Sequence, residues 1–143
     1  MEHYSLAEVE EGVLSKECVP ASLPLPPDWG WLAVEGGGAG VGQLVGPAAR
    51  LARTHRAVVI AGAGPGVAGA VSLAERVKRR LGAGRGGQRG LAVGELLTKE
   101  VWRPRIPGPA PLLVTRRVPT IHILLEADGQ PGSNLLETLW AEQ

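Results

Sequence analysis

Basic side chains gather in one stretch of the 143-residue chain, and their chemistry is that of phosphate binding. Residues 76–90 join a basic, helix-like run to a Gly/Arg-rich continuation that contains one Arg-Gly-Gly element. Such cations neutralise nucleic-acid phosphates, and the run is also typical of a nuclear localisation patch. An ordinary solvated helix end followed by a linker is the alternative interpretation. The predicted polyanion-binding residues are Arg76, Lys78, Arg79, Arg80, Arg85 and Arg89.

A second pattern places three glycines between an apolar run and a helix-like segment. Residues 57–61 lead into Gly62-Ala63-Gly64-Pro65-Gly66, where glycines permit a tight turn and let backbone amides approach a pyrophosphate. The stretch resembles the glycine-rich turn of Rossmann-type dinucleotide-binding proteins, particularly short-chain dehydrogenases, although Ala68 stands where a further glycine is usual. This resemblance implies phosphate binding by Gly62, Gly64 and Gly66. A compact strand–helix turn in a glycine-rich sequence is the alternative.

Catalytic patterns do not accompany the glycines. Tyr4 is the only tyrosine, so the Tyr-x-x-x-Lys of the short-chain dehydrogenases is missing, and no Lys-Ser or Lys-Thr pair marks a P-loop. His122, Glu126 and Asp128 occupy alternate positions of a predicted strand, where they could hold a metal or form an ordinary solvent face. We therefore expect a non-enzymatic protein with no catalytic residue, cofactor or metal site.

The elements that would position these residues follow from hydrophobic spacing. The continuous apolar run at 57–61 predicts a strand buried on both faces, and the amphipathic pattern at 67–81 predicts the helix after it. Further strands are expected at 29–35, 112–114 and 120–125, the last two separated by Pro119. A helix is expected over 46–55, with Pro47 in its first turn, and another after Ser133.

The N-terminal part is expected to differ from the rest. Ser5 to Glu8 matches a capping box, which predicts an acidic helix near 6–17, and the Pro-rich residues 20–27 then predict an extended linker. The sequence thus divides into 1–28, an acidic N-terminal helix and Pro-rich linker, and 29–143, a small α/β domain with a flexible Gly/Arg loop at 82–90. The predicted fold class is a small, loop-rich, single α/β domain with a few strands and amphipathic helices. A largely disordered chain is the alternative.

Composition qualifies these motifs. With 21 Gly, 12 Pro and no Phe, the chain shows the residue usage of GC-rich coding DNA, so its glycine-rich patterns carry less information. The net charge of +1 hides a segregation: residues 1–35 carry −6, residues 36–119 carry +11, and residues 120–143 carry −4. A basic middle between acidic ends binds a polyanion, or the ends fold back and neutralise it.

Three hypotheses for function follow. The first is an interaction protein whose basic middle binds an anionic macromolecule, with nucleic acid as the candidate partner. The second is a small Rossmann-like nucleotide- or phosphate-binding module that uses the Gly62–Gly66 turn. The third is the product of a GC-rich open reading frame with no selected activity.

Location and assembly are less constrained. A single cysteine and the lack of a signal-peptide pattern favour an intracellular location, cytoplasmic or nuclear. The uncharged run 57–74 holds several Gly and a Pro, so no membrane span is expected. The oligomeric state is left open.

Overall fold

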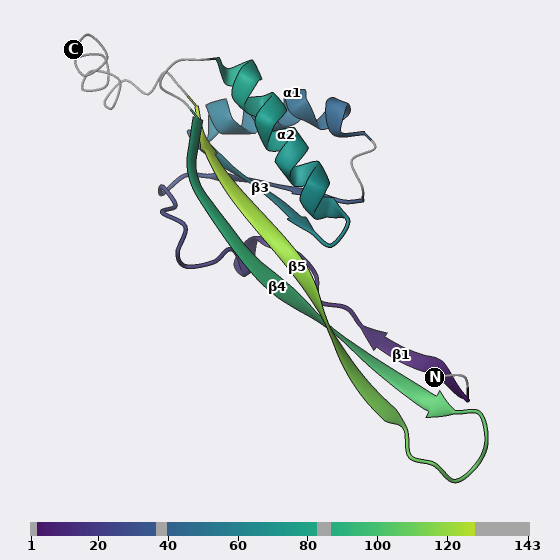
Figure 1. Ribbon diagram of the computed structural model, residues 1–143. Coiled ribbons are helices and arrows are strands. Elements are labelled where there is room, and N and C mark those ends of the chain that lie inside the picture. Colours follow the sequence, from purple (N-terminus) through teal and green to yellow (C-terminus); the bar gives the residue numbers. More distant parts are fainter. Residues whose placement is uncertain (1–2, 37–39, 83–86, 128–143) are drawn as a thin grey trace.

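A computed structural model describes residues 3–36, 40–82 and 87–127. They form one mixed five-stranded sheet with two helices against one of its faces, which are drawn in Figure 1. In chain order the elements are β1 (Tyr4–Glu10), the short 3-10 helix η1 (Lys16–Cys18), β2 (Gly30–Val34), α1 (Val41–Thr54), β3 (Ala57–Ala63), α2 (Gly66–Leu81), β4 (Gly87–Pro104) and β5 (Leu112–Glu126). The α/β class is confirmed, and the alternative of a largely disordered chain is wrong.

The sheet has the strand order β1-β4-β5-β3-β2. Only β2 and β3 run parallel, since β5 is antiparallel to both β3 and β4, and β1 is antiparallel to β4. A Rossmann domain has a mostly parallel sheet with helices on both faces. The similarity to that fold is therefore confined to the single unit of β3, its turn and α2.

The helix-side face of the sheet carries the main core. Alternate residues of β3 and β5 point toward the helices, among them Ile60 and Ile123, and meet Leu73 and Val77 of α2. The predicted strand at 57–61 and the predicted helix at 67–81 are both confirmed, because continuous apolar burial and helical periodicity are strong local signals. Helix α1 begins earlier than expected, so Pro47 lies inside it rather than in its first turn, on an exposed side.

The opposite, outer face of the sheet is covered by the chain between η1 and β2. Leu23 is buried there against Val59 and Leu124, with Trp29 and Trp31 partly buried beside them. Part of the segment expected as a plain linker therefore packs on the sheet. The two central strands consequently have an apolar layer on each side, which explains the unbroken hydrophobic run at 57–61.

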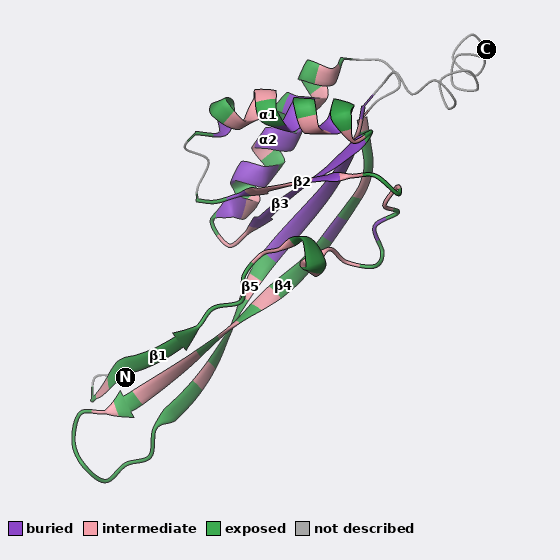
Figure 2. Ribbon diagram, turned by 180° about the vertical axis from the view of Figure 1, so that it is seen from behind, coloured by how far each residue is buried: buried purple, intermediate pink, exposed green. Residues whose placement is uncertain are grey.

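Strands β4 and β5 continue far beyond this body as a two-stranded arm, and β1 lies along the far part of β4 (Figure 1). Buried residues concentrate in the body and give way to exposed ones along the arm (Figure 2). The N-terminal helix expected near 6–17 is wrong: residues 4–10 form β1, and only residues 16–18 are helical. The capping box does not form a helix here because β4 offers this segment a backbone partner instead.

Two further sequence expectations change in β4 and β5. Residues 112–126 form one strand, not two. The pairing of β5 with β3 covers Thr120 to Glu126, so at Pro119 the paired strand is β4. Proline is tolerated at such a position. The predicted Gly/Arg loop at 82–90 is also shorter, since Gly87 to Gly90 already belong to β4. The helix expected after Ser133 lies outside the described residues.

Candidate nucleic-acid interface

Helices α1 and α2 present arginine side chains on their exposed sides. Residues 41–82 contain seven basic residues and one acidic residue, for a net charge of +6. The two helices pack against each other, and the Arg53 guanidinium donates a hydrogen bond to the Arg80 carbonyl oxygen at 3.2 Å. We define the helix surface as the exposed residues Arg50, Arg53, Arg76, Arg79 and Arg80. Helical spacing in both helices produces this charge, because it brings arginines of α1 and α2 that are 23 to 30 positions apart in sequence into one layer.

The predicted polyanion cluster is divided by this arrangement. Arg76, Arg79 and Arg80 belong to the helix surface, and Arg76 lies beside the first turn of α1, where a Cβ built on Gly42 would be 3.4 Å from its Nη1. Lys78 instead turns toward β4, with Nζ 2.6 Å from Glu75 Oε1 and 3.4 Å from Gln88 Oε1.

The two remaining members of the cluster lie beyond α2. Arg89 lies on β4 and pairs with Glu126 at 3.0 Å, and Arg85 lies outside the described residues. Sequence reasoning left Arg50 and Arg53 out of the cluster. Both residues lie off the apolar face of the helix predicted over 46–55, and this position indicates that they belong to the exposed basic surface.

The arm carries a second set of basic residues, but carboxylates accompany them. Residues 95–118 contain five basic and two acidic residues. Three ion pairs join them: Arg116 lies 2.8 Å from Glu100, Arg117 lies 3.6 Å from Glu95, and Arg103 lies 3.8 Å from Glu8 of β1. The arm therefore presents a more neutral surface than the helices.

Glu100 is the best-held carboxylate of the arm. Its Oε1 accepts hydrogen bonds from Trp102 Nε1 at 3.1 Å and from Arg116 Nε at 2.8 Å. These two donors, the Trp102 indole more than the Arg116 guanidinium, lower the pKa of Glu100 below its usual value. Glu100 thus stays ionised and holds one arginine of β5 in place.

The glycine turn serves close packing. A Cβ on Gly62 would overlap the carbonyl group of Gly66, and one on Gly66 would overlap the carbonyl oxygen of Val34. Gly64 has φ +53°, and its N–H donates to the Pro119 carbonyl at 2.8 Å, while the Val67 N–H donates to the Gly64 carbonyl at 3.1 Å. Two turn amides are thus already bonded within the protein. Phosphate binding by Gly62, Gly64 and Gly66 stays a prediction.

His122 is buried on the outer face of the sheet, although its strand position was compatible with a solvent face. The side chain is 1% exposed, its two ring nitrogens have no hydrogen-bond partner, and its ring lies 6.0 Å from that of Trp31. Burial lowers the pKa of His122 below its ordinary value because the charged form loses hydration. Within the described ranges no group of three or more His, Cys, Asp or Glu side chains could hold a metal ion, and Asp128 lies outside those ranges.

Acidification is expected to destabilise the protein through His122. Because its folded-state pKa lies below the unfolded value of 6.5, the unfolded chain takes up the proton first as the pH falls below that value. The free energy of unfolding should then fall by on the order of 1 kcal/mol between about pH 7 and pH 5. The variant His122→Leu, measured by urea unfolding at both pH values, should lose less stability than the parent. Equal losses in the two proteins would contradict a titrating buried imidazole.

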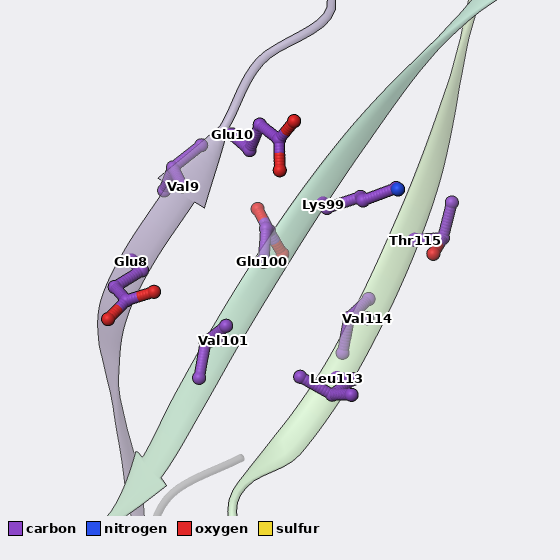
Figure 3. Close-up of a pocket in the computed structure, with 9 residues that line it drawn as sticks. All are labelled: Glu8, Val9, Glu10, Lys99, Glu100, Val101, Leu113, Val114 and Thr115. Carbon is purple, nitrogen blue, oxygen red and sulfur yellow. The ribbon is translucent and has the colours of Figure 1, made fainter.

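The arm and the body each carry a further surface among the described residues. The arm holds a groove of about 420 Å³ between β1, β4 and β5, lined by Glu8, Val9, Glu10, Lys99, Glu100, Val101, Leu113, Val114 and Thr115 (Figure 3). An apolar strip also lies at the edge of the body, where Leu91 and Val93 of β4 are 54% and 73% exposed and Val71 of α2 is 41% exposed. Neither α1 nor α2 has the length and apolarity that a membrane-crossing helix requires.

Comparison with known proteins gives one informative match. No protein-family model matches the chain. The human ribonuclease P protein subunit p25-like protein is 36% identical over 140 residues, an alignment that covers 90% of this chain and 76% of the human protein. Identity at this level over most of both chains indicates common ancestry and a shared fold. The chain therefore belongs to the family of the ribonuclease P protein subunit p25-like protein.

Proposed function

We propose that the protein is a non-catalytic, RNA-binding subunit of a ribonuclease P-type ribonucleoprotein. The observation that carries this proposal is the helix surface, where five exposed arginines stand in a segment with a single acidic residue. The name of the human relative supports an assembly of this class, since it describes that protein as similar to the p25 subunit of ribonuclease P. Such an assembly agrees with the cytoplasmic or nuclear location that the sequence predicts.

The helix surface favours contact with the RNA backbone over reading of bases. Guanidinium groups bind phosphate oxygens through paired N–H donors, and their release of counterions supplies most sequence-independent affinity. Base stacking would need aromatic side chains, and residues 32–101 contain no Phe, Trp or Tyr. We therefore infer that the preferred ligand is structured RNA, recognised by the spacing of its phosphates.

The apolar strip supports the role of a subunit. Isolated apolar side chains are common on protein surfaces, but Val71, Leu91 and Val93 come from two neighbouring elements. Lys78 of α2 reaches Gln88 of β4, so this flank of the helix faces the edge strand that carries the other two residues. The proposal assigns this strip to a protein neighbour in the same ribonucleoprotein and the helix surface to RNA.

A salt series tests the RNA-binding proposal directly. The full chain is titrated into a fluorescein-labelled RNA stem-loop and the dissociation constant is measured by anisotropy. Five phosphate contacts predict a slope of log affinity against log salt of about −3.5, which is a loss of roughly 100-fold between about 0.05 and 0.2 M salt. An affinity that does not change with salt would contradict backbone recognition by the helix surface.

A further inference from the structure

Strand β1 is attached to the arm mainly by its backbone, and none of its residues is buried. It pairs with the last residues of β4, from Tyr4 opposite Pro104 to Glu10 opposite Lys99, and the register shifts between Leu6 and Glu8. Every β1 residue after Tyr4 is exposed. Just outside the strand, the Arg105 N–H donates to the His3 carbonyl and the Gly12 N–H donates to the Leu97 carbonyl. An element with few buried contacts opens at a much lower free energy than the whole fold.

The charge of β1 is opposite to that of the arm it covers. Residues 95–118 have a net charge of +3, and Glu8 and Glu10 of β1 reduce the total to +1. Glu8 Oε1 lies 3.8 Å from Arg103 Nη2, and Glu10 is in register with Lys99 on β4. Figure 3 shows Glu10 extending from β1 toward β4 and Glu8 lying over β1, while Lys99 points away toward β5. β1 thus places carboxylates where an RNA phosphate would otherwise meet the arm.

We propose that β1 is an acidic cover of the arm in the electrostatic sense: RNA displaces it and gains the basic residues beside it, whose charge Glu8 and Glu10 offset. The inference rests on the proposed function. It adds that the carboxylates of β1 compete with RNA phosphates for the basic residues of the arm. Exposed ion pairs such as Glu8 with Arg103 contribute little to stability, so phosphates can replace the carboxylates at small cost. Arg116 and Arg117 keep their own partners on β4, which means that the cover acts mainly on Arg103, which pairs with Glu8, and on Lys99, which lies opposite Glu10 in the strand register.

Neutral variants of the cover test this proposal in the full chain. The double variant Glu8→Gln/Glu10→Gln should bind the labelled stem-loop about tenfold more tightly at about 0.15 M salt, with a salt slope steeper by about 1.4, because two phosphate contacts are gained. The matched control is Glu17→Gln/Glu35→Gln, which removes the same charge from exposed positions in η1 and after β2. Equal gains in both double variants would show an effect of net charge alone and overturn the cover.

A second readout separates displacement from electrostatics. Hydrogen exchange of the β1 amides should become faster when the stem-loop is added, while exchange in α2 stays unchanged. Slower exchange in β1 on RNA binding would overturn displacement. In a protein that also carries Arg103→Gln, the gain in RNA affinity from Glu8→Gln should disappear, since the cation that pairs with Glu8 is absent. An undiminished gain in affinity would also contradict the proposal.

The two proposals fail in different ways. If the helix surface is needed for binding but the Glu8/Glu10 variant behaves like its control, the RNA-binding function stands and the cover is overturned. If the parent and the Glu8/Glu10 variant both fail to bind the stem-loop at about 0.05 M salt, where phosphate contacts are strongest, the proposed function fails, and the cover fails with it.

Discussion

Replacing Gly62 by alanine is expected to destabilise the protein by about 3 kcal/mol, because the added methyl group has no space between β3 and α2. The new Cβ would overlap the backbone carbonyl of Gly66 and lie 2.9 Å from the Cβ of Ala70. Backbone atoms at the start of a packed helix cannot move aside as a flexible side chain would. The helix would have to shift away from the strand that forms the centre of the sheet.

Urea unfolding followed by circular dichroism measures this effect, and Gly46→Ala is its matched control. Gly46 lies within α1, and a Cβ built on it meets no atom within 4 Å. Alanine there should stabilise the protein by about 0.5–1 kcal/mol, since glycine is the poorer helix former. A small effect of the same sign at both positions would mean that the turn is not closely packed.

Removing three arginines from α2 is expected to weaken RNA binding by roughly 50-fold at about 0.15 M salt. The variant Arg76→Gln/Arg79→Gln/Arg80→Gln loses three exposed guanidiniums of the helix surface. Each lost phosphate contact should also reduce the salt slope by about 0.7, for a total near 2. The measurement is the anisotropy titration with the labelled stem-loop, repeated across salt concentrations.

The control removes the same charge from cations that already have carboxylate partners. Lys78, Arg89 and Arg117 pair with Glu75, Glu126 and Glu95 respectively. Their triple glutamine variant should weaken binding several-fold less than the α2 variant. Equal losses would show that total charge decides the affinity, and that the division of the predicted cluster has no functional meaning.

The parts of the fold that could be predicted from the sequence are those with local causes. The strand at 57–61 and the helix at 67–81 follow from burial on both faces and from helical periodicity, and β2 follows from a short apolar run. β1 could not be predicted, because its partner Pro104 lies 100 positions from Tyr4 and nothing local distinguishes it from a capped helix. The length of the arm could not be predicted either, since proline and glycine residues within β4 and β5 indicated that these strands would be interrupted.

The sequence predicted the kind of candidate site, a polyanion-binding surface, but not which basic residues form it. Basic residues close together in sequence indicated a polyanion surface, yet helical geometry separates Lys78 from Arg79 and brings in Arg53. Pairing with acids is a property of the folded chain, which a count of charges along the sequence does not contain. The relationship to a human protein also argues against an unselected reading frame, because such a product would have no relatives over most of its length.

The pairing of the first strand with the fourth has a consequence for the order of events during synthesis. Residues 4–10 leave the ribosome before their partners at 99–104, which follow almost a hundred residues later. At about 5–20 residues per second, the early segment waits for roughly 5–20 seconds without its partner strand. Its two glutamates and the prolines at 20–27 suit this interval, because charge and proline both discourage strand pairing with other nascent chains. Strand β1 thus cannot join the sheet before most of the residues that the structure describes have been made.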